Sequence, residues 1–405
     1  MTRRALAVDA SSRCRAVPAQ TAAERRRWDE FVARSRDGSM RQCFWWADPL
    51  ERYGVVSIAV GCWREEELIG GALLRAIPVP YTRFTITECL DGPLFVSWEP
   101  EWGEVFVEAL AELADEARSV AVSVKGCPRA DVLEDVVAAL RRRGARLTTS
   151  AGVTDAVLPL GNRTPADVTS GFHKGTKRAV KKGREAPTHI RRVTTRDELR
   201  RAHAAWMATA ARKEFDDVRP WDALEPVLRH AVDHDVGSVL ATFRDDELLA
   251  AIFVTHMGTQ GTYVYGGYLD GAEQYRPNHV LHLEAIELLL AAGVDAYNLG
   301  SLMGAGQFKL GFGAKAVKRL DTLTWERRPL LYGLLQHARG LRVGRTVEKL
   351  LRRRLVSRRG LAGSETEVAQ SKRVVHMATA HTRTTLGYSS RNAARSSQRV
   401  MRSIS

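Results

Sequence analysis

The stretch CWREEELIGGAL, which runs from Cys62 to Leu73, is repeated as TFRDDELLAAIF from Thr242 to Phe253. Both copies carry, in order, an aromatic residue, an arginine, two acids, Glu-Leu, an aliphatic residue and two small residues. Each copy predicts a strand, a polar turn at the acidic pair and a second strand. The offset of 242 − 62 = 180 residues is a domain length, which favours two related domains over a hairpin that recurs by chance.

The segments that follow the two copies also correspond, because each predicts a strand, a helix and a further strand. These elements are expected at 120–126, 130–144 and 154–160 after the first copy, and at 262–268, 279–293 and 295–301 after the second. Apolar residues in both helices recur at helical spacing, and Gly144 and Gly293 end them. Hairpins mixed with helices predict two tandem α/β domains with mixed sheets.

Charge separates a nearly neutral body from a basic tail. The chain of 405 residues has a net charge of +14, and residues 341–405 contribute 15 − 3 = +12 of it. Few large apolar residues occur in that tail, so it cannot offset its ordering entropy and is expected to be largely disordered. We expect a first domain at 1–165, a second at 166–320, a closing strand and helix at 321–340 that return to the first domain, and the tail at 341–405.

The cysteine content and the hydropathy of the chain predict its cellular compartment and whether it binds a metal. The five cysteines are scattered without metal-ligand spacing, which predicts reduced thiols, no metal site and a cytoplasmic protein. The N-terminus lacks the apolar core of a secretory signal, and no apolar run approaches the ~20 residues of a membrane span. Any membrane contact is expected to be peripheral, at the inner face.

The segment SGFHKGTKRAVKKGREAP, Ser170–Pro187, concentrates positive charge. If it is helical from about Phe172, three- and four-residue spacings gather its cations on one face. These cations are Lys174, Lys177, Arg178, Lys181 and Lys182. They repel one another unless an anion neutralises them, so the segment is either a solvated linker helix or a helix that faces nucleic-acid phosphates.

The segment GSLMGAGQFKLGFGAK, Gly300–Lys315, resembles a phosphate loop but has neither the P-loop nor the dinucleotide spacing. In a strand-like conformation Phe308, Leu310 and Phe312 share one face and Lys309 points to the other. Apolar anchoring would then fix the ammonium where it can stabilise an oxyanion. The alternative is a surface lysine on a glycine-rich turn.

An acyl-CoA donor is not favoured by the start of the helix expected at 279–293. Acyl-CoA acetyltransferases usually carry a glycine-rich pyrophosphate loop at this place, whereas the chain reads EQYRPNHVLH, Glu273–His282. Arg276 is a candidate anion contact there. No Ser-His-Asp order, Cys-His pair or metal cluster suggests another catalytic device.

These features together resemble the Fem family of aminoacyltransferases. The resembling residues are Trp28, Gln42, Trp46 and Ala47 of a W-x14-Q-x3-WA pattern, DGP (Asp91–Pro93), KGTKRAVKKG (Lys174–Gly183), YVYGG (Tyr263–Gly267), RPN (Arg276–Asn278) and FKLGFG (Phe308–Gly313). The resemblance implies two fused acetyltransferase-like (GNAT-like) domains. No long helical hairpin interrupts the second domain, as in the compact members.

The resemblance also implies an activity. An acceptor amine attacks the ester that joins an amino acid to tRNA, and a peptide bond forms. Lys309, after Phe308, would stabilise charge at the ester, and the basic helix would bind the tRNA. The implied acceptor-binding residues are Gln42, Trp46, Asp91, Tyr265 and Arg276. No cofactor is implied besides aminoacyl-tRNA as co-substrate, and Asp91, Glu284 and the substrate itself are alternatives for the base.

Two departures concern the acceptor. Leu50 stands where comparable cell-wall members carry a phosphate-binding lysine, and GPLFVSW (Gly92–Trp98) lacks their aspartate. The acceptor is therefore either a peptidoglycan-precursor peptide or a small specialised-metabolite amine. The basic tail either attracts tRNA or a membrane or plays no part. Two other functions stay open: an acyl-CoA-dependent N-acyltransferase, and a non-catalytic RNA- or membrane-binding protein.

Overall fold

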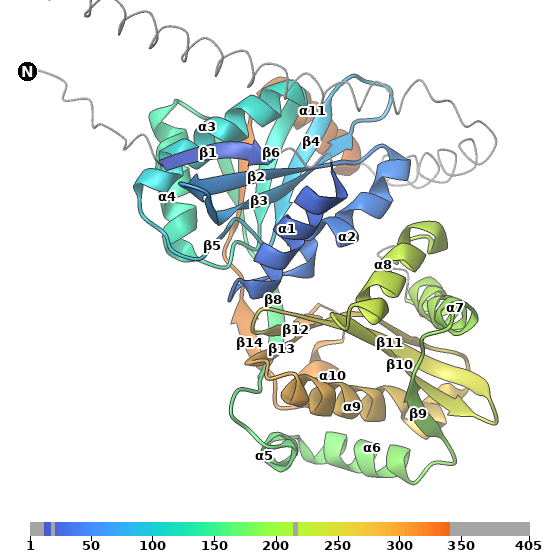
Figure 1. Cartoon of the computed structure of the whole chain (residues 1–405). Coiled ribbons are helices and arrows are strands. Elements are labelled where there is room, and N and C mark those ends of the chain that lie inside the picture. Colours follow the sequence, from blue (N-terminus) through green and yellow to red (C-terminus); the bar gives the residue numbers. More distant parts are fainter. Residues whose placement is uncertain (1–11, 18–20, 214–217, 304, 341–405) are drawn as a thin grey trace, which may run out of the picture.

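The structure, a computed structural model, describes residues 12–17, 21–213, 218–303 and 305–340. The described chain forms two mixed sheets, each covered by helices, stacked one after the other along the molecule (Figure 1). The predicted tail at 341–405 lies outside the described residues.

The first sheet has the strand order β1-β2-β3-β4-β6-β15-β7, with β5 paired to β3. Its strands are β1 (Ser12–Val17), β2 (Val56–Arg64), β3 (Glu67–Pro78), β4 (Thr85–Leu90), β5 (Leu94–Phe95), β6 (Ser119–Lys125), β7 (Leu147–Ser150) and β15 (Thr322–Glu326). The helices of this half are α1 (Ala22–Arg34), η1 (Met40–Gln42), α2 (Phe44–Ala47), η2 (Asp48–Tyr53), α3 (Glu101–Glu116), α4 (Ala130–Arg142) and α11 (Pro329–Gly340).

The second sheet has the order β14-β8-β13-β12-β11-β10-β9. Its strands are β8 (Thr154–Pro159), β9 (His189–Arg192), β10 (Gly237–Arg244), β11 (Glu247–Met257), β12 (Gln260–Tyr268), β13 (Ala296–Ser301) and β14 (Lys315–Lys318). The helices are α5 (Pro165–Ser170), α6 (Lys174–Arg184), α7 (Arg196–Arg212), α8 (Trp221–Asp233), η3 (Ala272–Tyr275), α9 (Pro277–Ala291) and α10 (Gly306–Leu310).

The repeated stretch forms the same hairpin in both sheets. β2 pairs with β3 and β10 with β11, both antiparallel, and both ladders shift register at the equivalent step, Cys62/Trp63 and Thr242/Phe243. In each half a third antiparallel strand, a helix and a parallel strand follow: β4–α3–β6 and β12–α9–β13. The predicted pairing of the helix at 130–144 with the helix at 279–293 is therefore wrong. The counterpart of α9 is α3, which has helical periodicity as well.

The two halves exchange a strand. β8 lies between them in the sequence and pairs with β13 and β14 of the second sheet, although its residues fall inside the range 1–165. β15 follows the second half and pairs with β6 and β7 of the first sheet. The strand expected at 154–160 exists as β8. The repeat suggested that it belongs to the first sheet, whereas it belongs to the second. Each sheet is thus incomplete without chain from beyond its own half.

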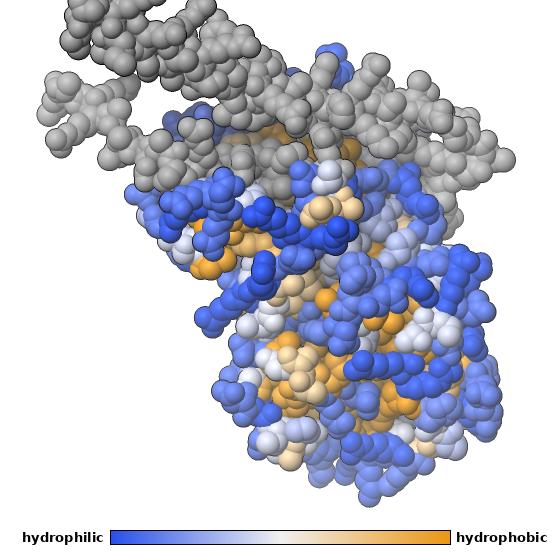
Figure 2. Space-filling model, in the orientation of Figure 1, coloured by the Kyte–Doolittle hydropathy of each residue, from blue (hydrophilic) through white to orange (hydrophobic). Residues whose placement is uncertain are grey.

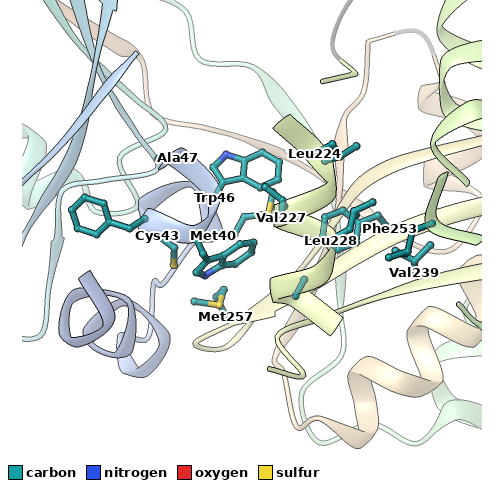
Figure 3. Close-up of a cluster of buried hydrophobic side chains, with 14 of the residues drawn as sticks. Met40, Cys43, Trp46, Ala47, Leu224, Val227, Leu228, Val239, Phe253 and Met257 are labelled. Carbon is teal, nitrogen blue, oxygen red and sulfur yellow. The ribbon is translucent and has the colours of Figure 1, made fainter. Parts of the chain in front are cut away.

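A shared core also joins the halves. Trp46 and Met40 of the first half pack with Leu224 and Val227 of α8 and with Phe253 of β11 in one buried cluster (Figure 3). Because this cluster crosses between the sheets, separating them would expose apolar surface. Domain motion is therefore opposed by core packing.

The thiols differ in part from expectation. Cys62 is disulfide-bonded, so the prediction of reduced thiols is wrong for this residue, whereas Cys43, Cys89 and Cys127 are free and buried. In the β1–β2 register Cys62 lies opposite Cys14, a proximity that their separation in sequence does not reveal. Among the described residues, no group of His, Cys, Asp and Glu side chains could hold a metal ion, and no helix is both long and apolar enough to cross a membrane.

Candidate functional site

The second sheet opens between its two parallel strands. β12 and β13 pair only where Gln260–Thr262 meets Ala296–Asn298, although β12 continues to Tyr268 and β13 to Ser301. In the first sheet, by contrast, β4 and β6 pair along their whole length. Where a ladder ends, backbone groups become available to an extended ligand. We call this region, residues 263–268 and 299–301, the β12–β13 opening.

Lys309 lies at the β12–β13 opening. Its Nζ donates to the backbone oxygen of Ser301, 2.5 Å away, and lies close to Gly300. The strand-like conformation expected here is wrong, because Gly306–Leu310 forms the short helix α10. The predicted apolar anchor is nevertheless present. Phe308 and Phe312 are four residues apart, and their ring centroids lie 5.3 Å from each other.

The environment of Lys309 alters its acidity. Partial burial lowers the pKa of Lys309, nearby Lys213 lowers it further, and Asp155 opposes the shift. A lysine that is held by its neighbours and partly desolvated is a positioned cation rather than a freely moving surface charge. Its partial burial and its bond to Ser301 distinguish Lys309 from a fully exposed lysine on a surface turn.

An aromatic cluster holds the helix that carries Lys309. The ring of His282 lies 5.5 Å from that of Phe308 and 5.4 Å from that of Phe312. His282 is buried, and its Nδ1 shares a 2.9 Å hydrogen bond with the hydroxyl of Tyr297. Burial, with help from His279 and Lys309, lowers the pKa of His282 to about 3. His282 is therefore neutral at physiological pH and acts in packing.

An ionic bridge lies where the two sheets meet. Arg319 donates through Nε to Asp155 Oδ2 and through Nη1 to Asp91 Oδ1, both at 2.6 Å. Asn298 of β13 donates to the same Asp155 oxygen at 2.9 Å. Ser39 Oγ donates to the other oxygen of Asp91 at 2.9 Å. Asp91, predicted to bind the acceptor, is thus held by partners from both halves of the chain.

Two other predicted acceptor residues are buried. Gln42 is fully buried, accepts from the Leu73 N–H at 2.8 Å and donates to the Leu90 oxygen at 2.6 Å. These bonds fix β3 against the end of β4, which gives Gln42 a positioning role in the fold. Trp46 lies in the shared core under the guanidinium of Arg219, 3.8 Å above the ring, and its carbonyl accepts from Arg219 at 2.6 Å.

The two remaining predicted acceptor residues differ in position: Tyr265 packs against the shared core that contains Trp46, and Arg276 lies beside the basic helix. Tyr265 is on β12 at the opening, half-buried, with its ring 5.6 Å from that of Trp206. Arg276 is exposed with a positive φ of 53° and sits just before α9, beside α6. Tyr265 therefore lies beside the core that Trp46 shares between the halves, and Arg276 lies apart from it. Arg276 belongs with the basic helix, while Gln42, Trp46 and Asp91 belong to the first half.

The basic segment is a helix, as predicted. In α6 all five predicted cations are exposed, and Thr176, Val180 and Gly183 face inward. A shallow pocket of about 340 Å³ lies along its edge, lined by Phe172, Val180 and Leu283 together with cations of α6. The lower end of the molecule, where α6 lies, presents mainly hydrophilic residues (Figure 2). This face suits an extended polyanion better than a buried ligand.

Sequence reasoning missed Asp155, Asn298 and Arg319. They come from β8, β13 and the residue after β14, and no motif joins them. A further pocket, of about 440 Å³, lies where η2 meets α8 and includes Trp45, which stacks on His230 at 5.0 Å. None of its residues has a sequence signature either.

Comparisons with known proteins agree with this architecture. A model of the acetyltransferase (GNAT) domain matches residues 170–310. The described fold is thus of the tandem GNAT class, as predicted. The crystal structure of FemX superposes with a TM-score of 0.67 at 15% identity, covering 76% of this chain and 98% of FemX. The resemblance to the Fem family is confirmed at the level of the fold.

A second solved structure is similar over the same extent. It is a conserved protein of unknown function from Bacteroides thetaiotaomicron VPI-5482, with a TM-score of 0.52 and 12% identity, covering 75% of this chain and 96% of that protein. No curated protein matches the chain in sequence. At these identities the comparisons define the fold and leave the substrates to chemical argument.

Proposed function

We propose that this protein is an aminoacyltransferase that moves an amino acid from aminoacyl-tRNA to an acceptor amine. The amine nitrogen attacks the ester carbonyl, a tetrahedral oxyanion forms, the amide bond closes and the ribose oxygen of the tRNA leaves with a proton. The ester is already activated, so positioning of the two substrates can supply about 7–11 kcal/mol of acceleration. No enzyme nucleophile is required.

The observation that carries the proposal is Lys309 at the β12–β13 opening. An ester bound along the parted strands would bring its carbonyl oxygen near the ammonium that now donates to Ser301. Loss of such an oxyanion donor in other enzymes costs about 10²–10³ in turnover. Substitution of Lys309 should therefore lower the rate of transfer while the protein stays folded.

The position of α6 supports tRNA over CoA as the donor. Gly183 of α6 packs on the entry to α9, where a Cβ atom would lie 3.3 Å from the backbone oxygens of Tyr275 and Arg276. Pro277 at the first turn removes one of the N–H groups that would face a pyrophosphate. The helix start is thus covered and lacks the glycine-rich loop, while the outer face of α6 offers cations to a phosphate backbone.

The acceptor in this proposal is an amine of a peptidoglycan-precursor peptide or of a small specialised metabolite. Arg319 and Asn298 bind Asp155, and Arg319 also binds Asp91, so neither of these two carboxylates at the sheet junction is free to act as a base. Glu284 is exposed on the outer side of α9. We therefore assign proton removal to the substrates rather than to a named side chain.

The test uses purified full-length protein, tRNA charged with labelled amino acids, and a cell extract as the source of acceptor. We expect label to enter a small product, RNase to abolish the transfer, and Lys309→Met to lower it at least about 100-fold. The matched control is Lys315→Met, which removes an exposed lysine of the same half. Transfer that resists RNase and requires acetyl-CoA would instead favour the acyl-CoA alternative.

A further inference from the structure

Large apolar side chains are exposed along one side of α11 and on the loop between β3 and β4. Leu330 is 88% exposed, Leu334 is 68% exposed, and Tyr81 of the loop is 88% exposed. Leu330 and Leu334 are four residues apart and so share one face of the helix. Single exposed apolar residues are ordinary, but neighbouring ones of this size mark an interaction surface.

The packing of α11 does not account for these residues. On its inner side the helix packs the half-buried Leu331, Tyr332 and Leu335 against a cluster that includes Val79 and Phe84 of the same loop. This contact places the β3–β4 loop beside the start of α11. The helix therefore has an inner apolar side that serves the core, and an outer one, with Leu330 and Leu334, that no core cluster of the described residues includes.

Arginine side chains lie near the exposed apolar residues of α11 and the β3–β4 loop. Arg83 and Arg328 are exposed and lie over the ring of Phe84, at 5.8 and 4.9 Å from its centroid. Neither the loop 79–84 nor α11 contains an acidic residue. Asp115, the acid that reaches Arg327 nearby, is engaged by that pair. The chain beyond α11, residues 341–405, carries 15 basic and 3 acidic residues, a net charge of +12.

We propose that α11 and the β3–β4 loop form a docking surface for an anionic lipid membrane. Leucine and tyrosine side chains enter the boundary between headgroups and acyl chains, while arginines bind lipid phosphates. Exposed apolar residues on a helix and a loop that contain arginine but no acid fit a bilayer of anionic lipid better than a protein, whose own surface carries both signs of charge. No spanning helix is needed for this mode of binding.

The surface lies away from the proposed tRNA helix. α11 is at one end of the molecule and α6 at the other (Figure 1). Docking through α11 would leave α6 and the β12–β13 opening accessible to their ligands. The inference thus goes beyond the transferase proposal and does not depend on it.

The test is co-sedimentation of the full chain with phosphatidylcholine vesicles, with and without phosphatidylglycerol. We expect binding only when phosphatidylglycerol is present, and weaker binding at high salt. The double variant Leu330→Glu/Leu334→Glu should bind at least about tenfold more weakly. The matched control is Val96→Glu/Val153→Glu, which places the same charges at two other exposed apolar positions, and it should bind like the wild type.

Three results would overturn the docking surface. Absence of wild-type binding excludes a membrane partner. Binding of the Leu330→Glu/Leu334→Glu variant at wild-type strength assigns the attraction to charge elsewhere in the chain. A dimer in light scattering that this variant dissociates identifies a second copy as the occupant. Thermal unfolding verifies that the variant is folded, and the RNase-sensitive transfer assay bears only on the proposed function.

Discussion

Arg319 and Asp91 form an ion pair with a 2.6 Å contact across 228 residues of sequence. Arg319 follows the last strand of the second half, and Asp91 follows β4 of the first. Because Arg319 also binds Asp155 of β8, one guanidinium joins the end of β4 to the strand that the first half contributes to the second sheet. The exchange of strands is thus held by charge as well as by backbone ladders.

Arg319→Met should destabilise the protein by about 2–4 kcal/mol, because two carboxylates with little exposure lose their cation. The control is Arg64→Met, which breaks the exposed pair Arg64–Glu99 and should cost less than about 1 kcal/mol. Urea unfolding measures both. Equal small losses would mean that the bridge contributes no more than a surface ion pair.

A pair of glycines in α6 tests how closely this helix packs on α9. A Cβ atom added at Gly175 would have no neighbour within 4 Å, so Gly175→Ala should stabilise the protein by about 0.5–1 kcal/mol through helix propensity. At Gly183 a Cβ would meet Val280 Cγ1 at 2.7 Å and two backbone oxygens at 3.3 Å. Gly183→Ala should therefore destabilise despite the same gain in propensity. If both variants were stabilised, as measured by thermal unfolding, α6 would not be closely packed there.

The hairpin repeat predicted the tandem fold because turn residues and alternating strands are local features. The match of α4 to α9 was wrong because α3 and α4 both have the periodicity of half-buried helices. Periodicity alone does not show which of the two is the counterpart of α9. The return of residues 321–340 to the first half was expected, and β15 does pair there. The transfer of β8 to the second sheet was not expected, since ladder partners more than a hundred residues apart leave no local pattern.

For the candidate site, too, local sequence features were predictable and features that depend on tertiary structure were not. Lys309 and the cations of α6 were singled out by residue type and spacing, and their roles in catalysis and tRNA binding stay predictions. The predicted strand around Lys309 was wrong, since the same five residues also fit a short helix, with Phe308 on the helix and Phe312 in the turn that follows it. The roles of Gln42 and Trp46 depend on burial, which a short motif does not encode. Their function in acceptor binding stays a prediction.

Charge reversal on α6 should weaken tRNA binding and flatten its salt dependence. Each lost phosphate contact lowers the slope of log K against log salt by roughly 0.9 or less. Lys174→Glu/Lys177→Glu should therefore reduce the slope by about 1–2. Arg200→Glu/Arg229→Glu, with the same charge change on exposed positions of α7 and α8, is the control. Filter binding at several salt concentrations measures the slopes, and indistinguishable slopes would remove α6 from the tRNA site.

The alkaline side of the pH–rate profile should report the ionisation of Lys309. Only its ammonium form can donate to an oxyanion, so activity is lost as the pH rises through the pKa of Lys309. Burial and Lys213 lower that pKa, while Asp155 raises it. The alkaline limb should therefore lie below the usual lysine value of about 10.4. The acid limb belongs to the acceptor amine, which must lose its proton before it attacks.

Two substitutions should move the alkaline limb in opposite directions. Asp155→Asn removes the carboxylate that favours the ammonium, so the limb should shift to lower pH. Lys213→Gln removes a like charge, so the limb should shift to higher pH. Single-turnover rates with pre-charged tRNA measure both shifts, and unfolding curves verify that Asp155→Asn is still folded. A limb that stays fixed in both folded variants would show that it arises from another group, and Lys309 would lose its assigned role.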